Sequence, residues 1–185
     1  MAVKIMQSES NTEVRSTLDE RGSRYGDYLD NANLTQDLYH IIARQNDNLR
    51  PFELETIHMV CHKCARILCG DPNYLDNYVD INGYIQLMLD ILSRDDIQDC
   101  IEADLTRLPW NTNKLGIDLN LNWPIDAINK HFTASKKSTR LKTHIASILR
   151  YATKYVISGR KNYLTLCISH VDKMMVDIQL GNTYD

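Results

Sequence analysis

Apolar residues recur every three or four positions over most of the chain, which is the spacing of one face of an α-helix. The clearest helix is expected to begin at Pro51, a residue suited to the first helical turn, and to end just before Gly70. A second long helix is expected from about Asn73 to Ser93. Because only Asp71-Pro72 connects them, the two helices should pack as an antiparallel hairpin.

The N-terminal region has a weaker pattern. Residues 1 to 20 are rich in Ser, Asn and Glu and are expected to form a mobile arm that leads into a short helix ending near Arg21-Gly22. Such an arm would become ordered against a partner. A short amphipathic helix is then expected from a cap at Asn33 to the polar stretch that begins at Gln45.

The second half of the chain repeats the helical pattern after an interruption. A short helix is expected over residues 94 to 108, and the period breaks in a linker over residues 109 to 123. Three more helices are expected, one beginning at Pro124, one ending at Ile157 and one from Tyr163 to Gln179. The sequence therefore predicts an all-α fold with an antiparallel helical hairpin or bundle over residues 21 to 108 and a second small helical part over residues 124 to 180.

The composition excludes several classes of protein. A hydrophobic content of 43% can supply a packed core, and a net charge of -3 argues against general binding to nucleic acids. No run of about eighteen apolar residues is present and Met1 to Ser10 lacks the apolar centre of a secretory signal, so a cytoplasmic protein without a membrane segment is expected. The five cysteines are an odd number without the spacing of a disulfide framework, so reduced thiols are expected.

Acidic residues on the helix after Pro72 are candidates for a metal site. Asp76, Asp80 and Tyr84 recur at intervals of four and therefore lie in one row. The two carboxylates, with Glu55 on the facing helix, could hold Mg²⁺, which prefers carboxylate oxygens and recruits substrate phosphates. The alternative is a solvated acidic face. Gly83 lies within the same helix, where it costs about 1 kcal/mol relative to Ala, and tight helix packing is its expected explanation.

The segment Cys61-His62-Lys63-Cys64 is similar in composition to a zinc site. One helix cannot place four ligands around a tetrahedral ion, and no second Cys-x-x-Cys pair exists in the chain, so zinc binding is not expected. Buried cysteines are the expected interpretation.

Basic residues and tyrosines alternate near the C-terminus, a pattern suited to phosphate contact and base stacking. Arg150 and Lys154 share a helical face, Tyr155 is adjacent to Lys154, and Arg160 and Lys161 follow in a turn. A solvated basic face is the alternative interpretation.

Three motifs in the first half occur in a fixed order. They are Arg21-Gly22-Ser-Arg24-Tyr25-Gly26, Lys63-Cys-Ala-Arg66-Ile67 and Asp76-Asn77-Tyr-Val-Asp80-Ile81-Asn-Gly83-Tyr84. In this order the segment resembles a family of small phage and prophage proteins of unknown function, over more than a third of the chain. The resemblance implies a phage origin.

That family is distantly similar to the all-α nucleotide pyrophosphohydrolases of the MazG type, in which helix-borne Glu and Asp residues bind Mg²⁺ around a nucleoside triphosphate. Asp76 and Asp80 correspond to the second half of the enzymes' acidic motif and Glu55 to the first, whereas the full Glu-Glu-x-x-Glu motif is missing.

A second, weaker resemblance lies near the C-terminus. The segments Pro124-Ile-Asp-Ala-Ile128 and Lys154-Tyr155-Val-Ile-Ser-Gly159-Arg160-Lys161 resemble the C-terminal signature of a phage nucleotide kinase family. This resemblance implies nucleotide binding by the second half of the chain.

These observations favour a nucleotide-binding protein, which in a phage would sequester a nucleotide-derived signal of host defence. A Mg²⁺-dependent pyrophosphohydrolase or a nucleotide kinase is one alternative, and a helical protein that binds and inhibits a host protein is another. A homo-oligomer is expected, because a hairpin with a short companion helix buries little apolar area alone. The expected ligand-binding residues are Arg24, Tyr25, Lys63, Arg66, Tyr84, Arg150, Lys154, Tyr155, Arg160 and Lys161, and the expected metal ligands are Asp76, Asp80 and Glu55.

Overall fold

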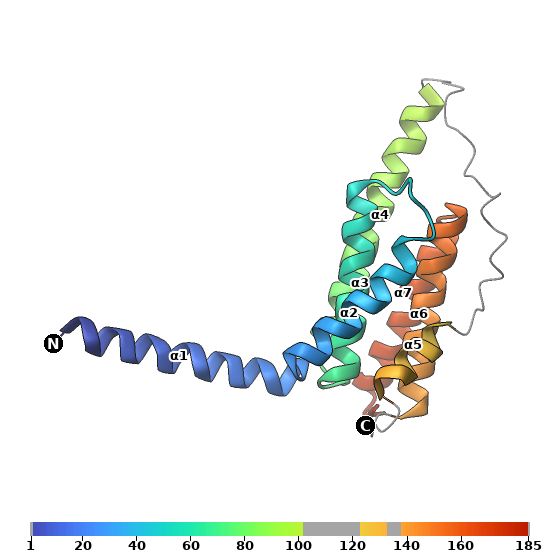
Figure 1. Ribbon diagram of the computed structural model, residues 1–185. Coiled ribbons are helices and arrows are strands. Elements are labelled where there is room, and N and C mark those ends of the chain that lie inside the picture. Colours follow the sequence, from blue (N-terminus) through green and yellow to red (C-terminus); the bar gives the residue numbers. More distant parts are fainter. Residues whose placement is uncertain (1, 102–122, 133–137, 185) are drawn as a thin grey trace.

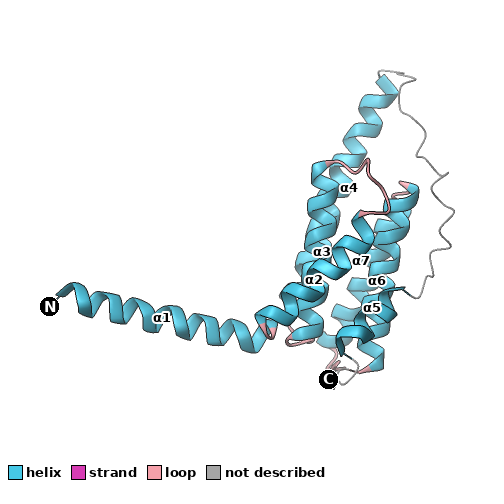
Figure 2. Cartoon of the chain, in the orientation of Figure 1, coloured by secondary structure: helices cyan, strands magenta, loops and turns pink. Residues whose placement is uncertain are grey.

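The computed structural model describes residues 2–101, 123–132 and 138–184. Within these ranges the regular structure is helical throughout, which confirms the expected all-α fold class (Figures 1 and 2). The helices are α1 (Ala2–Tyr25), α2 (Tyr28–Ala43), α3 (Pro51–Cys69), α4 (Asp76–Ile101), α5 (Trp123–Phe132), α6 (Thr139–Ser158) and α7 (Asn162–Gln179).

The helices form a bundle from which one helix projects. α2 to α7 lie together, while α1 points away from them and meets the bundle only at its C-terminal end (Figure 1). The C-terminal turns of α4 extend beyond the bundle at the opposite end (Figure 1). None of the helices in the described part of the chain is both long and apolar enough to cross a membrane.

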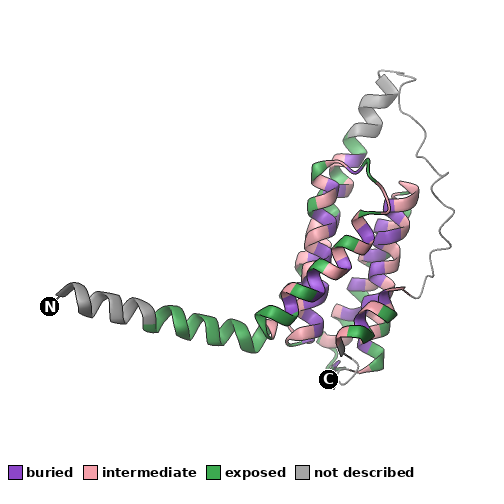
Figure 3. Cartoon of the chain, viewed as in Figure 1, coloured by how far each residue is buried: buried purple, intermediate pink, exposed green. Residues whose placement is uncertain are grey.

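One hydrophobic core joins the two halves of the chain. Its fully buried members come from both, and five examples are Leu38, Ile57, Ile85, Ile145 and Val171 (Figure 3). The two helical parts expected from the sequence therefore share their core. Of the expected linker over residues 109 to 123, all but Trp123 lies outside the described residues, and Trp123 already belongs to α5.

The expected bounds of α3 are confirmed, because Pro51 is its first residue and Gly70 follows its end. The start of α2 differs from the prediction. Its N-cap is Asp27, whose carboxylate accepts hydrogen bonds from the amides of Leu29 and Asp30, so the expected cap at Asn33 was wrong. Leu29 is exposed, and the apolar period consequently becomes visible only after the helix has begun.

Two other helices are longer than expected. α1 is one continuous helix from Ala2 to Tyr25, so the expected boundary between an arm and a short helix at residue 20 was wrong. α4 likewise runs without a break to Ile101, so a separate helix beginning at residue 94 was wrong, and residues 102 to 108 lie outside the described part. The sequence between 94 and 101 contains no Gly or Pro that would stop a helix.

Candidate functional site

Several of the predicted binding residues meet where α1 reaches the bundle. Arg24 and Tyr25 are the last two residues of α1, and Arg66 lies in the last turn of α3. Tyr74 lies in the connection between α3 and α4. We call these four residues the basic corner.

Two glycines permit this meeting of backbones. A Cβ atom on Gly26, whose φ is +76°, would lie 2.3 Å from the carbonyl oxygen of Cys69, and one on Gly70 would lie 2.2 Å from that of Arg24. The amide of Asp71 donates a hydrogen bond to the same Arg24 carbonyl at 2.8 Å. A side chain at either position would clash with these backbone atoms. Both glycines are therefore needed for the close contact between the end of α1 and the end of α3.

The side chains of the basic corner contact one another in a row. The guanidinium of Arg66 lies 4.0 Å from the centre of the Tyr25 ring, which meets the Tyr74 ring edge-on at 5.9 Å. The guanidinium of Arg24 lies 5.3 Å from the centre of the Tyr74 ring and also pairs with Glu20 at 2.8 Å. Arg24 also donates a hydrogen bond to the Tyr74 hydroxyl at 3.4 Å. The contact with Tyr25 holds the Arg66 guanidinium in place and leaves N–H groups at its edge available for hydrogen bonds.

Lys63 has a different role from the one expected. Its side chain is buried and forms an ion pair with Asp80 of α4, which crosses the hairpin. Since the ammonium group already has a carboxylate partner, Lys63 connects α3 to α4 and is not a free phosphate ligand. Asn77, one turn before Asp80, is fully buried, and neither polar atom of its amide has a hydrogen-bond partner among the described residues.

Positive charge accumulates along the end of α3. The pKa of His62 is lowered from 6.5 to about 4, first by burial and then by electrostatic interaction with Arg66, Lys63 and His58. Arg66 has no ion pair with a carboxylate of the described residues. A positive charge without a carboxylate partner next to a neutral imidazole is an arrangement that attracts an anion.

The expected metal ligands do not gather around one point. Asp80 pairs with Lys63, while Glu55 and Asp76 are exposed. In the part of the chain that the structure describes, no three His, Cys, Asp or Glu side chains are close enough to hold a metal ion together. The row of Asp76 and Asp80 on α4 is present, but Glu55 does not complete a site with it.

The next turn of α4 contains the remaining candidates of the first half. Tyr84 is half-buried there, one turn beyond Asp80. Gly83 is exposed, and a Cβ atom added to it would have no heavy atom within 4 Å, so the expected explanation by tight helix packing was wrong.

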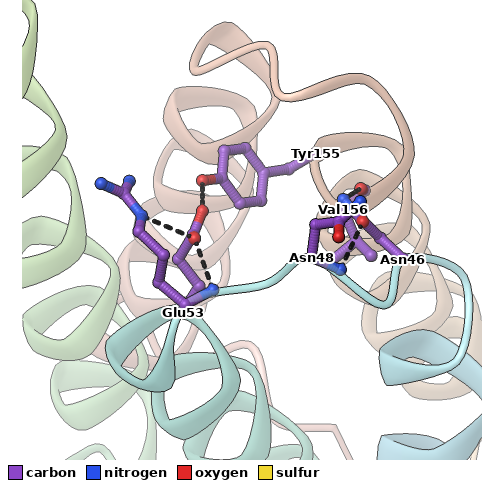
Figure 4. Close-up of polar contacts among 6 residues, drawn as sticks. Asn46, Asn48, Glu53, Tyr155 and Val156 are labelled. Atoms are coloured by element: carbon purple, nitrogen blue, oxygen red, sulfur yellow. Dashed lines mark hydrogen bonds and ion pairs between the residues drawn. The ribbon is translucent and has the colours of Figure 1, made fainter. Parts of the chain in front are cut away.

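The candidates of the second half lie elsewhere, and several already have partners. Tyr155 is fully buried, and its hydroxyl donates a hydrogen bond to Glu53 in the first turn of α3 (Figure 4). The ammonium group of Lys161 donates to the carbonyl of Leu92 at 2.5 Å. That of Lys154 lies 5.8 Å and 5.6 Å from the ring centres of Tyr151 and Tyr163. Base stacking by Tyr155, as predicted from the sequence, is incompatible with this burial.

The two groups of candidates therefore lie at opposite ends of α3. Glu53, the partner of Tyr155, and Arg66 are separated by thirteen residues, which correspond to about 20 Å along a helix. Arg150 is half-buried on α6 and Arg160 is exposed after it. The structure does not combine the two halves of the chain into a single nucleotide site.

Three of the four cysteines whose side chains the structure describes are buried, as expected for interior residues. Cys61, Cys64 and Cys167 are buried, and Cys69 is half-buried. Burial raises the pKa of the Cys64 thiol to about 12 and that of Cys61 well above its ordinary range, so both are protonated at neutral pH.

Glu53 was not identified as a site residue from the sequence. It is 1% exposed, and its carboxylate accepts hydrogen bonds from the amide and the Nε group of Arg50, both at 2.9 Å, in addition to Tyr155 (Figure 4). The available indication was its position one turn before Ile57 in the apolar row of α3. A carboxylate in such a row indicates a buried charge with partners.

Comparisons with protein families, with curated proteins and with solved structures found no match to this chain.

Proposed function

We propose that this protein binds a nucleotide or a nucleotide-derived small molecule and that the basic corner binds its phosphate group. The observation that carries the proposal is the environment of Arg66. Its guanidinium lies over the Tyr25 ring and has no carboxylate partner among the described residues. A planar guanidinium with fixed orientation suits the bidentate recognition of phosphate.

The arrangement favours contact with phosphate over contact with a base at Tyr25. Arg66 covers one face of the Tyr25 ring, and the Tyr74 ring lies beside it at an interplanar angle of 70°. A base would have to displace this stack, whereas a phosphate would bind the outer N–H groups and leave it intact. Tyr84, half-buried on α4, remains the candidate for contact with the base.

Binding without chemistry is the favoured form of this function. A pyrophosphohydrolase would use clustered carboxylates to place a metal-bound water. Here Asp80 is paired with Lys63, and Glu55 does not join Asp76 in a three-membered group within the described residues. In a phage, a protein of this kind would sequester a nucleotide-derived signal used by host defence.

The proposal is tested by incubating the protein with nucleoside mono-, di- and triphosphates and with cyclic and ADP-ribose-type nucleotides, with and without Mg²⁺. Mass spectrometry then measures the free ligand before and after the protein is denatured. Depletion followed by intact recovery supports binding, and a new product that depends on Mg²⁺ would show catalysis. No depletion of any ligand contradicts the proposal.

Matched arginine variants then test the place of binding. Arg66→Gln is expected to weaken the affinity for a captured ligand by about ten- to a hundredfold, the loss of one charge-assisted contact. Arg15→Gln removes the same charge from the exposed part of α1 and serves as the control. Equal affinity of the two variants would place binding away from the basic corner.

A second candidate function is binding of a host protein through α1. Residues 12 to 24 of this helix are exposed throughout, and Val14 and Leu18, one turn apart, are 54% and 58% exposed. A helix without packing along its length is marginal in water, so a partner would stabilise it. Replacing both Val14 and Leu18 by Ser would abolish this interaction without changing the affinity for a nucleotide.

A further inference from the structure

The C-terminal residues fold back onto the bundle through one buried side chain. Tyr184 is 1% exposed, and its hydroxyl donates a hydrogen bond to Asp177 of α7 at 2.9 Å. Its backbone amide donates to the side chain of Asn73 at 3.0 Å. The guanidinium of Arg140, which pairs with Asp177 at 2.8 Å, lies 4.9 Å from the centre of the Tyr184 ring. We call these contacts of Tyr184 the C-terminal clasp.

Two histidines lie directly beside the clasp. Nδ1 of His144 on α6 and Nε2 of His170 on α7 are 2.9 Å apart, a hydrogen-bond distance, and both side chains are partly buried. The ring of Tyr184 meets the ring of His144 edge-on, with 5.7 Å between their centres. Tyr151 covers His170 from α6, at 6.4 Å between ring centres. We call His144 and His170 the histidine pair.

The hydrogen bond between the two rings limits the protons that the pair can hold. One nitrogen must donate and the other must accept, so the bond exists when the pair carries no extra proton or one. A second proton places donors on both nitrogens and puts two positive rings in contact. The pair must then separate, and the ring against which Tyr184 packs moves with it.

The surrounding charges oppose protonation on balance. Burial lowers the pKa of both histidines, and Arg140 and Lys173 lower that of His144 further, while Asp177 raises it. For His170 the further contributions come from His144 and Lys173. Tyr151 and Tyr184 also face the pair, and burial and the hydrogen bond to Asp177 raise the pKa of Tyr184 to about 12, so its hydroxyl stays protonated.

The clasp also holds the connection between α3 and α4. Asn73, whose side chain accepts the hydrogen bond from the Tyr184 amide, is adjacent to Tyr74 of the basic corner. In the same connection, the amide of Asp71 donates a hydrogen bond to the carbonyl of Arg24. Release of Tyr184 therefore removes a contact from the segment against which α1 is docked.

We propose that the histidine pair is an acid-sensitive switch that keeps the C-terminal clasp closed at neutral pH and opens it when both imidazoles are protonated. The switch needs no ligand at the basic corner, and its test uses the protein alone. Failure of this proposal and failure of the proposed nucleotide binding are therefore distinguishable.

The test measures hydrogen exchange of individual backbone amides by NMR at about pH 7.5 and about pH 5.5, expressed as protection factors that correct for the intrinsic pH dependence. In the unmodified protein the protection of the Tyr184 amide is expected to fall by about tenfold. This factor corresponds to a difference of about one unit between the pKa of the histidine pair in the closed state and in the open state. The Asp71 amide is expected to lose protection in the same pH range.

The decisive variant combines His144→Asn with His170→Gln, whose amides occupy the positions of the bonding Nδ1 and Nε2 atoms but do not titrate. It is expected to keep the clasp closed at both pH values, and His40→Gln, a change of an exposed histidine on α2, is expected to behave as the unmodified protein. Should the double variant not fold, His170→Gln alone removes the repulsion between two charged rings and is expected to keep the clasp closed. Unchanged protection of Tyr184 in the unmodified protein, or opening of the folded variants to the same degree, overturns the proposal.

Discussion

The two ends of α3 use charged side chains in opposite ways. At the N-terminal end the carboxylate of Glu53 is buried and accepts hydrogen bonds from Arg50 and Tyr155. At the C-terminal end the guanidinium of Arg66 is half-buried, stacks on Tyr25 and has no ion pair with a carboxylate of the described residues. Both residues are held firmly, but only the first is satisfied by the protein itself.

This difference separates architecture from binding. A buried charge whose hydrogen bonds are complete stabilises one arrangement of helices, and removing its partners is costly. A positioned charge with unused donors is available to a ligand. Changes at the Glu53 end should therefore affect the free energy of unfolding, and changes at the Arg66 end should affect the affinity for anions.

The largest effect is expected for Glu53→Ala. The substitution removes the cap contact to the Arg50 amide and leaves the buried Tyr155 hydroxyl without its acceptor, so the free energy of unfolding should fall by about 3 kcal/mol. Urea denaturation measures this loss. Glu55→Ala removes an exposed carboxylate of the same helix and should change stability by less than about 0.5 kcal/mol. Equal effects of the two variants would contradict the structural role assigned to Glu53.

The next effect concerns the junction of α1 with the Arg66 end. Gly26→Ala combines a positive φ with a Cβ atom 2.3 Å from the Cys69 carbonyl, and should destabilise the protein by about 2 kcal/mol. Because the same contact positions Tyr25, the variant should also lose affinity for a nucleotide under conditions in which it is folded.

Gly22→Ala is the matched control for this change. No heavy atom lies within 4 Å of the added Cβ, and the residue is inside α1, so the helix should gain up to about 1 kcal/mol. Thermal unfolding of the two alanine variants measures both changes: Gly26→Ala should lower the stability and Gly22→Ala should raise it. Destabilisation by Gly22→Ala would show that α1 packs against something along its length.

The sequence predicted the helices whose ends are marked by special residues. Pro51 and Gly70 limit α3, and their positions are sufficient to locate it. The start of α2 was missed because exposed Leu29 hides the period, and the continuation of α4 beyond Arg94 was missed because a fading apolar period is not itself a stop. Local chemistry ends a helix, whereas periodicity shows only which part of it is buried.

The candidate site was predictable in part for the same reason. The expected hairpin places the helix of Lys63 against the helix of Asp80, and the structure pairs these two residues. That this pairing occupies Lys63, and that Tyr155 is used by Glu53, depends on the register between helices far apart in the sequence. The histidine pair has no local signature at all, because its members are twenty-six residues apart on different helices.

A smaller effect is expected at Asn77, on the α4 face near the Arg66 end. Its buried amide has no hydrogen-bond partner among the described residues, so Asn77→Leu should raise the free energy of unfolding by about 1 kcal/mol. Thermal unfolding measures the change. A loss of stability would instead indicate that a bound water or ligand satisfies the amide, and it would extend the binding region from Arg66 to Asn77.

The effect that is smallest at neutral pH concerns His62, whose pKa is lowered first by burial and then by the charge of Arg66. Its folded-state pKa of about 4 lies below the ordinary value of 6.5, so the unfolded chain binds the proton more strongly. The stability that neutral His62 contributes is fully present above pH 6.5 and is lost progressively as the pH falls toward 4. His62→Gln should therefore flatten the decline of stability over this range, as urea denaturation at a series of pH values would show.

A bound phosphate would neutralise Arg66 and raise the His62 pKa, which NMR titration of the ring can follow with and without ligand. An unchanged His62 pKa on saturation with nucleotide would mean that the ligand binds away from this end of α3, and the contrast between the two ends would then concern stability alone.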